Sequence, residues 1–117
     1  MAAQSPADLF ITTITQAEIL YGIEIMAEGR RKQRLAEAAE EIFAQEFHGR
    51  ILAFDQPAAR HFARIVAARE SLGRPIADLD AMIAAIARAH GATLATRNVK
   101  DLEHCGIRLL NPWTDVH

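Results

Sequence analysis

The sequence lacks the features that mark secreted and membrane proteins. Its single cysteine, Cys105, cannot form an internal disulfide, which is typical of a reducing cytoplasm. No run approaches the roughly 18 apolar residues needed to span a bilayer. Residues 1–8 lack the charged and apolar regions of a signal peptide. These absences predict a soluble cytoplasmic protein.

Several common functional patterns are also missing. The net charge of −2 gives no overall basic excess, so any contact with nucleic acid must depend on a local patch. The five histidines show no pairing at a spacing of four, so a zinc site is not expected. The sequence contains no glycine-rich phosphate loop and no nucleophile elbow.

What the sequence does have is enough apolar material for one small domain. Of its 117 residues, 50% are hydrophobic, a share that can form a core. It contains no repeat, no low-complexity tract and no linker long enough to separate two units. We therefore expect a single domain over residues 1–117.

Apolar residues recur at spacings that alternate between strands and helices. The pattern predicts strands at residues 9–14, 50–54, 93–96 and 107–110. It predicts helices at residues 15–28, 31–47, 56–71 and 76–90, and a helical turn at 98–104. This alternation favours an α/β fold of three layers, with a mostly parallel sheet covered by helices on both faces.

In the second of these helices, the apolar spacing predicts which side chains point toward the core. The expected inward residues are Leu35, Ala38, Ala39, Ile42 and Phe43. In the third, Asp55 and Pro57 have the character of an N-cap and a first-turn proline, and Gly91 is expected to end the fourth.

Three acidic residues occupy positions where an α/β fold places its functional cleft. Glu18 and Asp101 each lie in the first turn after a predicted strand, and Asp80 lies near the start of a predicted helix. Carboxylates just beyond the ends of neighbouring parallel strands converge, and their repulsion requires a cation. Mg²⁺ prefers oxygen ligands and can activate water for attack on a phosphodiester. Arg97, next to the expected cleft, could hold a phosphate through its fork of donors.

Each acidic residue also has a structural explanation. Glu18 could reach back to the backbone of Thr15 as a capping-box partner. Asp80 could stabilise the helix dipole, and Asp101 could be a solvated cap. We assign Asp78 mainly to helix capping. The basic cluster Arg30, Arg31, Lys32 and Arg34 either follows a helix end as solvated cations or contacts RNA phosphates.

Three segments of the chain together resemble one known family. They are Ile-Thr-Gln-Ala-Glu-Ile at 14–19 with Gly22, Ile-Ala-Asp-Leu-Asp-Ala-Met-Ile-Ala-Ala at 76–85, and Ala-Thr-Arg-Asn-Val-Lys-Asp-Leu at 95–102. In this order and spacing, and with Asn-Pro-Trp at 111–113, the chain resembles the VapC-type toxins of the PIN-domain family. The likeness extends from about residue 9 to the end.

This resemblance implies a ribonuclease that uses Mg²⁺ or Mn²⁺ held by four acidic residues. By position, Glu18 is similar to the second acid of the family, Asp80 to the third and Asp101 to the fourth. Asn98 is similar to a polar helper beside the fourth acid, and Thr96 to the serine or threonine often found there. The resemblance also implies an RNA substrate, a cognate antitoxin and a homodimer.

The chain departs from the family pattern at its beginning. Family members open with a short apolar strand whose last residue is the first acid, whereas no acid precedes Asp8 here, and Asp8 lies before a strand. We therefore expect an N-terminally shortened PIN domain without the first strand, with impaired activity. The sheet would be completed by closure of the gap, by a segment of another copy or by oligomerisation. The alternative function is a catalytically inactive module that binds an antitoxin or dimerises.

Overall fold

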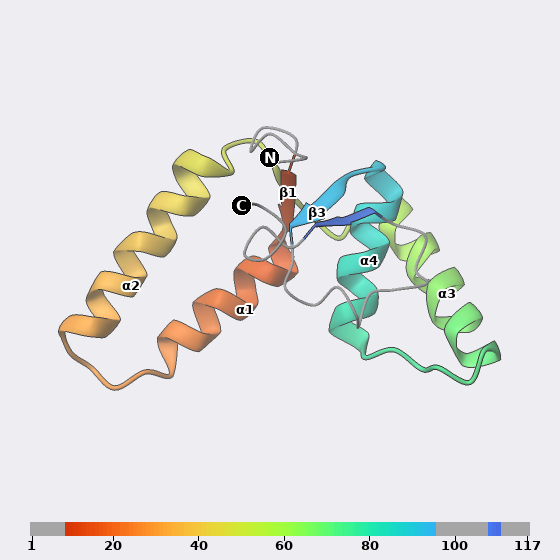
Figure 1. Cartoon of the computed structure of the whole chain (residues 1–117), viewed down its shortest axis with the longest axis horizontal. Coiled ribbons are helices and arrows are strands. Elements are labelled where there is room, and N and C mark those ends of the chain that lie inside the picture. The colour runs from red at the N-terminus through yellow and green to blue at the C-terminus, as the bar shows by residue number, and fades with distance from the viewer. Residues whose placement is uncertain (1–8, 96–107, 111–117) are drawn as a thin grey trace.

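The computed structural model describes residues 9–95 and 108–110, in which strands and helices alternate (Figure 1). The strands are β1 (Leu9–Thr12), β2 (Ile51–Leu52), β3 (Thr93–Ala95) and β4 (Arg108–Leu110). The helices are α1 (Thr13–Glu24), α2 (Arg30–Glu41), α3 (Gln56–Ser71) and α4 (Asp78–His90), and a π-helical segment, η2 (Ile42–Glu46), continues α2. The turn expected at residues 98–104 lies outside the described residues.

The strands form one parallel sheet in the order β2-β1-β3-β4. The two halves of β1 pair with different neighbours: Leu9 and Phe10 align with β3, while Ile11 and Thr12 align with β2. Within the described residues β1 and β3 pair directly, so the sheet has no gap between them. The expected α/β class and parallel sheet are confirmed.

Side chains on alternate positions of the strands join two separate apolar clusters. Leu9 and Ile11 pack with Ala39 and Phe43 of the α2–η2 helix, with Ile51 at the edge of this cluster. Leu52, the next residue of β2, belongs instead to a second cluster formed mainly by α3 and α4. Since neighbouring strand residues point to opposite faces, helices pack on both faces of this part of the sheet.

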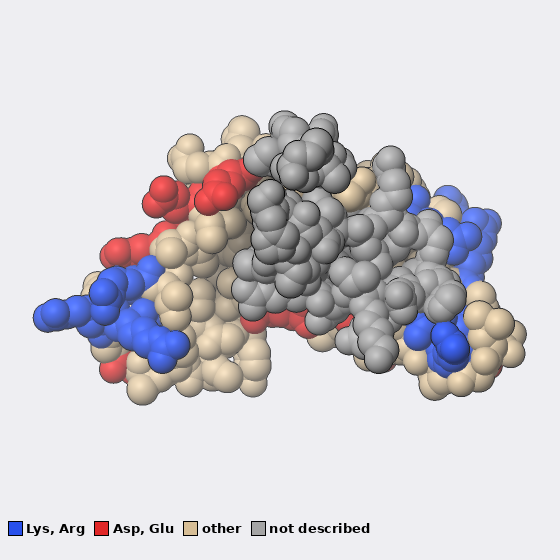
Figure 2. Space-filling model, in the orientation of Figure 1, with Lys and Arg blue, Asp and Glu red and all other residues tan. Residues whose placement is uncertain are grey.

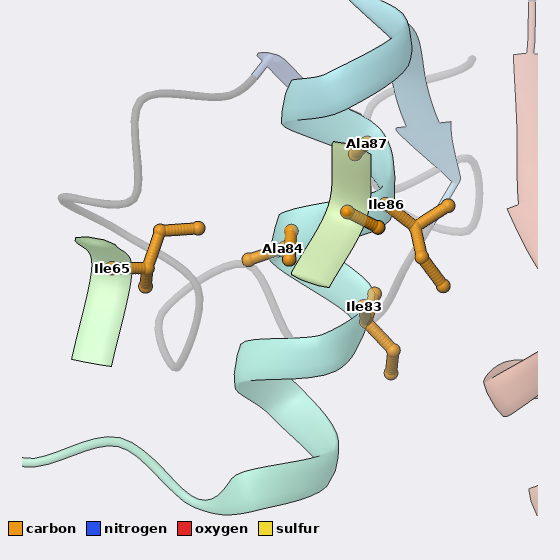
Figure 3. Packing of buried hydrophobic residues seen from close by; sticks show 7 residues of the cluster. Ile65, Ile83, Ala84, Ile86 and Ala87 are labelled. Carbon is orange, nitrogen blue, oxygen red and sulfur yellow. The ribbon is translucent and has the colours of Figure 1, made fainter. Parts of the chain in front are cut away.

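The α3–α4 unit is held by small side chains that are almost completely buried. Alanines 84, 85 and 87 of α4 and Ala58 of α3 are 0% exposed, and Ile65 and Ile86 fill the space around them (Figure 3). Short side chains at a helix contact allow the two backbones to approach closely. This unit is the most tightly packed part of the described structure.

The ends of α3 and α4 follow the local signals in the sequence. Asp55 is the N-cap of α3, and its carboxylate accepts a hydrogen bond of 3.1 Å from the backbone N–H of Ala58. Gly91 ends α4 with φ of 60°, a left-handed conformation that glycine adopts without strain. Both predictions are confirmed.

Helices α1 and α2 form a hairpin that projects to one side of the sheet (Figure 1). Lys32 holds its tip together, because Nζ donates to the backbone carbonyl of Glu24 at 3.1 Å and to the carboxylate of Glu28 at 2.6 Å. The hydrogen bond to Glu28 raises the pKa of Lys32. The tip is therefore ordered by contacts of its own rather than by the sheet.

The hairpin buries less of its apolar face than the sequence predicts. Ala39 and Phe43 are buried as expected, but Leu35 is 40% exposed and Ile42 is 38% exposed, and Ala38 is also exposed. The prediction of an inward position was therefore wrong for these three residues. The core beneath the hairpin is too narrow to cover the whole apolar stripe.

None of the helices in the described residues combines the length and the apolar character needed to cross a membrane.

Candidate functional site

The chain connections bring three segment ends to one edge of the sheet. Helix α1 starts directly at the carboxyl end of β1, and the residues after Ala95 leave the carboxyl end of the parallel neighbour β3. Helix α4 precedes β3, so it runs in the opposite direction and its amino end lies toward the same edge. Helices α1 and α4 are also in contact. This edge is where parallel α/β sheets carry their functional clefts.

Glu18 lies on α1, exposed, at this edge of the sheet. Its expected capping role is wrong, because α1 begins two residues earlier than predicted and its N-cap is Thr12. The hydroxyl oxygen of Thr12 accepts a hydrogen bond of 3.0 Å from the backbone N–H of Thr15. Glu18 is therefore one turn too far along α1 to serve the cap. Among the described residues its carboxylate has no hydrogen-bond partner.

Asp80 is half-buried in the first turn of α4, where the positive end of the helix dipole stabilises a carboxylate. Its position therefore fits both the structural and the functional explanation. Asp78 is exposed in the same turn, but the N-cap is Ala77 and makes no side-chain hydrogen bond. The assignment of Asp78 to capping is wrong.

The other predicted site residues, Asp101, Asn98, Thr96 and Arg97, lie outside the described residues. Within residues 9–95 and 108–110, no group of three or more histidine, cysteine, aspartate or glutamate side chains could hold a metal ion. Glu18 and Asp80 lie on helices in contact and offer carboxylate oxygens, the ligand type that Mg²⁺ prefers. One or two protein carboxylates with water and substrate phosphates are an ordinary ligand set for this ion.

The basic residues before the hairpin core are placed differently from one expectation. Arg30, Arg31, Lys32 and Arg34 lie inside the first turns of α2 and do not follow a helix end. The dipole is positive at this end of a helix, so it disfavours these cations. The idea that the dipole stabilises them is wrong.

A second basic group, on α3 and α4, was not anticipated from the sequence. Burial lowers the pKa of His61, and the charges of Arg88 and Arg64 lower it further. The Nδ1 atom of His61 is buried without a hydrogen-bond partner among the described residues. The three-residue spacing of His61 and Arg64 was visible on α3, whereas the approach of Arg88 depends on the packing of α4.

Comparison with known proteins identifies the family. The PIN domain family model matches residues 1–105. The chain is 36% identical to toxin FitB of Neisseria gonorrhoeae over 92% of its own length and 78% of the relative's. It is 35% identical to VapC ribonuclease Y4jK of Sinorhizobium fredii, covering 95% of the chain and 79% of that protein.

A solved structure supports the same assignment at the level of the fold. The structure of FitAB bound to an IR36 DNA fragment aligns with a TM-score of 0.84 and 34% identity, covering 98% of this chain and 80% of that one. The sequence relationship and the likeness of the fold therefore agree. The chain belongs to the PIN-domain family of VapC and FitB toxins.

Proposed function

We propose that this protein is a metal-dependent ribonuclease of a toxin–antitoxin pair, with Glu18, Asp80 and Asp101 as ligands of Mg²⁺ or Mn²⁺. The observation that carries the proposal is the convergence of α1, the amino end of α4 and the carboxyl end of β3 at one edge of the sheet. The printed name of the relative VapC ribonuclease Y4jK supports RNA as the substrate.

The two described carboxylates suit different parts of this task. Asp80 is half-buried in the first turn of a packed helix, so its position is fixed before substrate binds. Glu18 is exposed and can approach RNA phosphates together with the ion. When bound, the ion supplies positive charge that favours water attack on a phosphodiester. Thr96, Asn98 and Arg97 are proposed as polar and phosphate contacts.

The departure from the family at the first acid leads to a proposed reduction of activity. A site with three carboxylates instead of four holds its ion less tightly and positions the attacking water less well. A catalytically inactive module that binds an antitoxin is the second candidate. It is favoured by the observation that the described residues contain no complete metal-binding group.

Cleavage of a structured RNA with and without Mg²⁺ tests the proposal. We expect Asp80→Asn to lower the cleavage rate by about 100-fold or more. Asp78→Asn is the matched control, because it makes the same change two residues away on an exposed position of the same helical turn. Glu18→Gln and Glu24→Gln form a second pair, both on exposed positions of α1.

The outcomes separate the two candidates. Equal cleavage by Asp80→Asn and Asp78→Asn, or cleavage that persists in a chelator, would contradict the ribonuclease site. Association with an antitoxin without calorimetric binding of Mg²⁺ or Mn²⁺ would favour the inactive module.

A further inference from the structure

The charges of α2 are arranged against its own dipole. Its basic residues all lie in the first half of the helix, and its acidic residues all lie in the second half and in η2: Arg30, Arg31, Lys32 and Arg34, then Glu37, Glu40, Glu41 and Glu46. The first turn has no acidic residue, and the N-cap, Gly29, makes no side-chain hydrogen bond. Figure 2 shows blue atoms at the tip of the hairpin and red atoms along the rest of α2. A lone helix is destabilised by this order of charges at both ends.

An apolar stripe runs along the same helix and stays exposed. Leu35 and Ile42 are 40% and 38% exposed, and the exposed Ala38 lies between them. Their spacing of three and four residues is that of a seam between two packed helices. Arg34 and Glu41 each precede a large residue of the stripe by one position, so they flank the same side of it.

A helix with the same charge order would fit this surface only if it ran antiparallel. In that arrangement the basic half of one helix lies beside the acidic half of the other. The flanking positions also meet in pairs, so Arg34 faces Glu41 of the second copy, and the two-fold axis repeats the contact. A parallel copy would place like charges together along the whole length.

We propose that two copies of this chain associate through α2, antiparallel about the Leu35–Ala38–Ile42 stripe, with Arg34 of each copy paired with Glu41 of the other. The charge pattern that is unfavourable in one copy is thereby compensated in two. The surface is small compared with typical stable interfaces, so a weak dimer is expected, with a dissociation constant of roughly micromolar order. This proposal is independent of the ribonuclease proposal, since the described acids of that site are on α1 and α4.

Charge reversal provides a specific test by sedimentation velocity over a range of protein concentrations. We expect Arg34→Glu and Glu41→Arg each to weaken self-association at least tenfold. An equimolar mixture of the two variants should recover it. In the mixed dimer, the carboxylate introduced by the first substitution faces the guanidinium introduced by the second, and the unchanged Glu41 faces the unchanged Arg34. The double variant should recover self-association as well.

The controls separate the interface from folding and from net charge. Glu37→Arg changes the net charge as Glu41→Arg does, but position 37 lies on the side of α2 away from the stripe, so it should leave self-association unchanged. Both test substitutions improve the match to the dipole of α2, so helix content by circular dichroism should not fall.

Three outcomes would overturn the proposal. The first is an unaltered chain that stays monomeric up to about millimolar concentration, far above the micromolar range expected for a weak interface. The second is self-association that both single variants retain. The third is a mixture that associates no better than the separate variants. Binding of an antitoxin to α2 of a monomeric chain would be covered by the first outcome and would identify a different occupant.

Discussion

The α3–α4 unit and the α1–α2 hairpin use their apolar residues in opposite ways. In α3–α4, the buried residues of the cluster are 0 to 4% exposed. In the hairpin, large apolar side chains remain at the surface, including Tyr21 at 66% and Ile25 at 65% exposed. Exposed apolar residues that gather on one element are typical of an interaction surface. The comparison indicates that the first unit supports the fold while the hairpin provides surface for binding.

The largest expected effect is on the packing of α3–α4. Ile86 is fully buried, so Ile86→Ala should lower the free energy of unfolding by about 2–5 kcal/mol through lost burial and a cavity. Ile25→Ala makes the same change on an exposed position and should cost less than about 0.5 kcal/mol. Urea denaturation of both variants measures the difference. Equal losses would contradict the contrast between the two units.

A smaller effect is expected at the junction of the sheet and the hairpin. Thr12→Val keeps the shape of the side chain but removes the acceptor for the backbone N–H of Thr15, and should cost about 1 kcal/mol. Thr12→Ser keeps the oxygen and is the matched control. Urea denaturation distinguishes them, and a valine variant as stable as the serine variant would show that the cap does not stabilise α1.

The smallest expected effect is a change in the pH dependence of stability. The native state holds the pKa of His61 below its ordinary value, so the unfolded chain binds more protons just below pH 6.5. Stability contributed by the neutral ring is therefore present at higher pH and is lost as pH falls through this range. His61→Gln should make the unfolding free energy less steep between about pH 5 and 7. An unchanged slope would indicate that burial and the arginines do not act on this ring.

Signals that act within a few residues were readable from the sequence. Asp55 and Gly91 mark helix ends because a cap depends on its own backbone neighbours. The start of α1 was misplaced because Thr12 and Thr15 are both suitable caps, and only the end of β1 decides between them. The π-helical turn at Ile42–Glu46 had no local signal that we recognised.

Features that depend on distant packing were not readable in the same way. Periodicity identified an apolar stripe on α2, but it cannot show whether another element covers that stripe, so Leu35 and Ile42 were misjudged. For the site, the sequence indicated Glu18 and Asp80 one at a time. Their placement on helices that touch required the pairing of β1 with β3 and the contact between α1 and α4.

Both ends of the hairpin are attached to the same short strand. Helix α1 continues directly from Thr12, and at the other end Arg50 donates to the carbonyls of Glu46 and, at 2.6 Å, of Leu9. The guanidinium of Arg50 also lies 5.2 Å from the centre of the Phe47 ring. The hairpin is thus a lever whose fulcrum is β1. A load on its tip moves Glu18, which rides on the lever, relative to Asp80, which is fixed to the base.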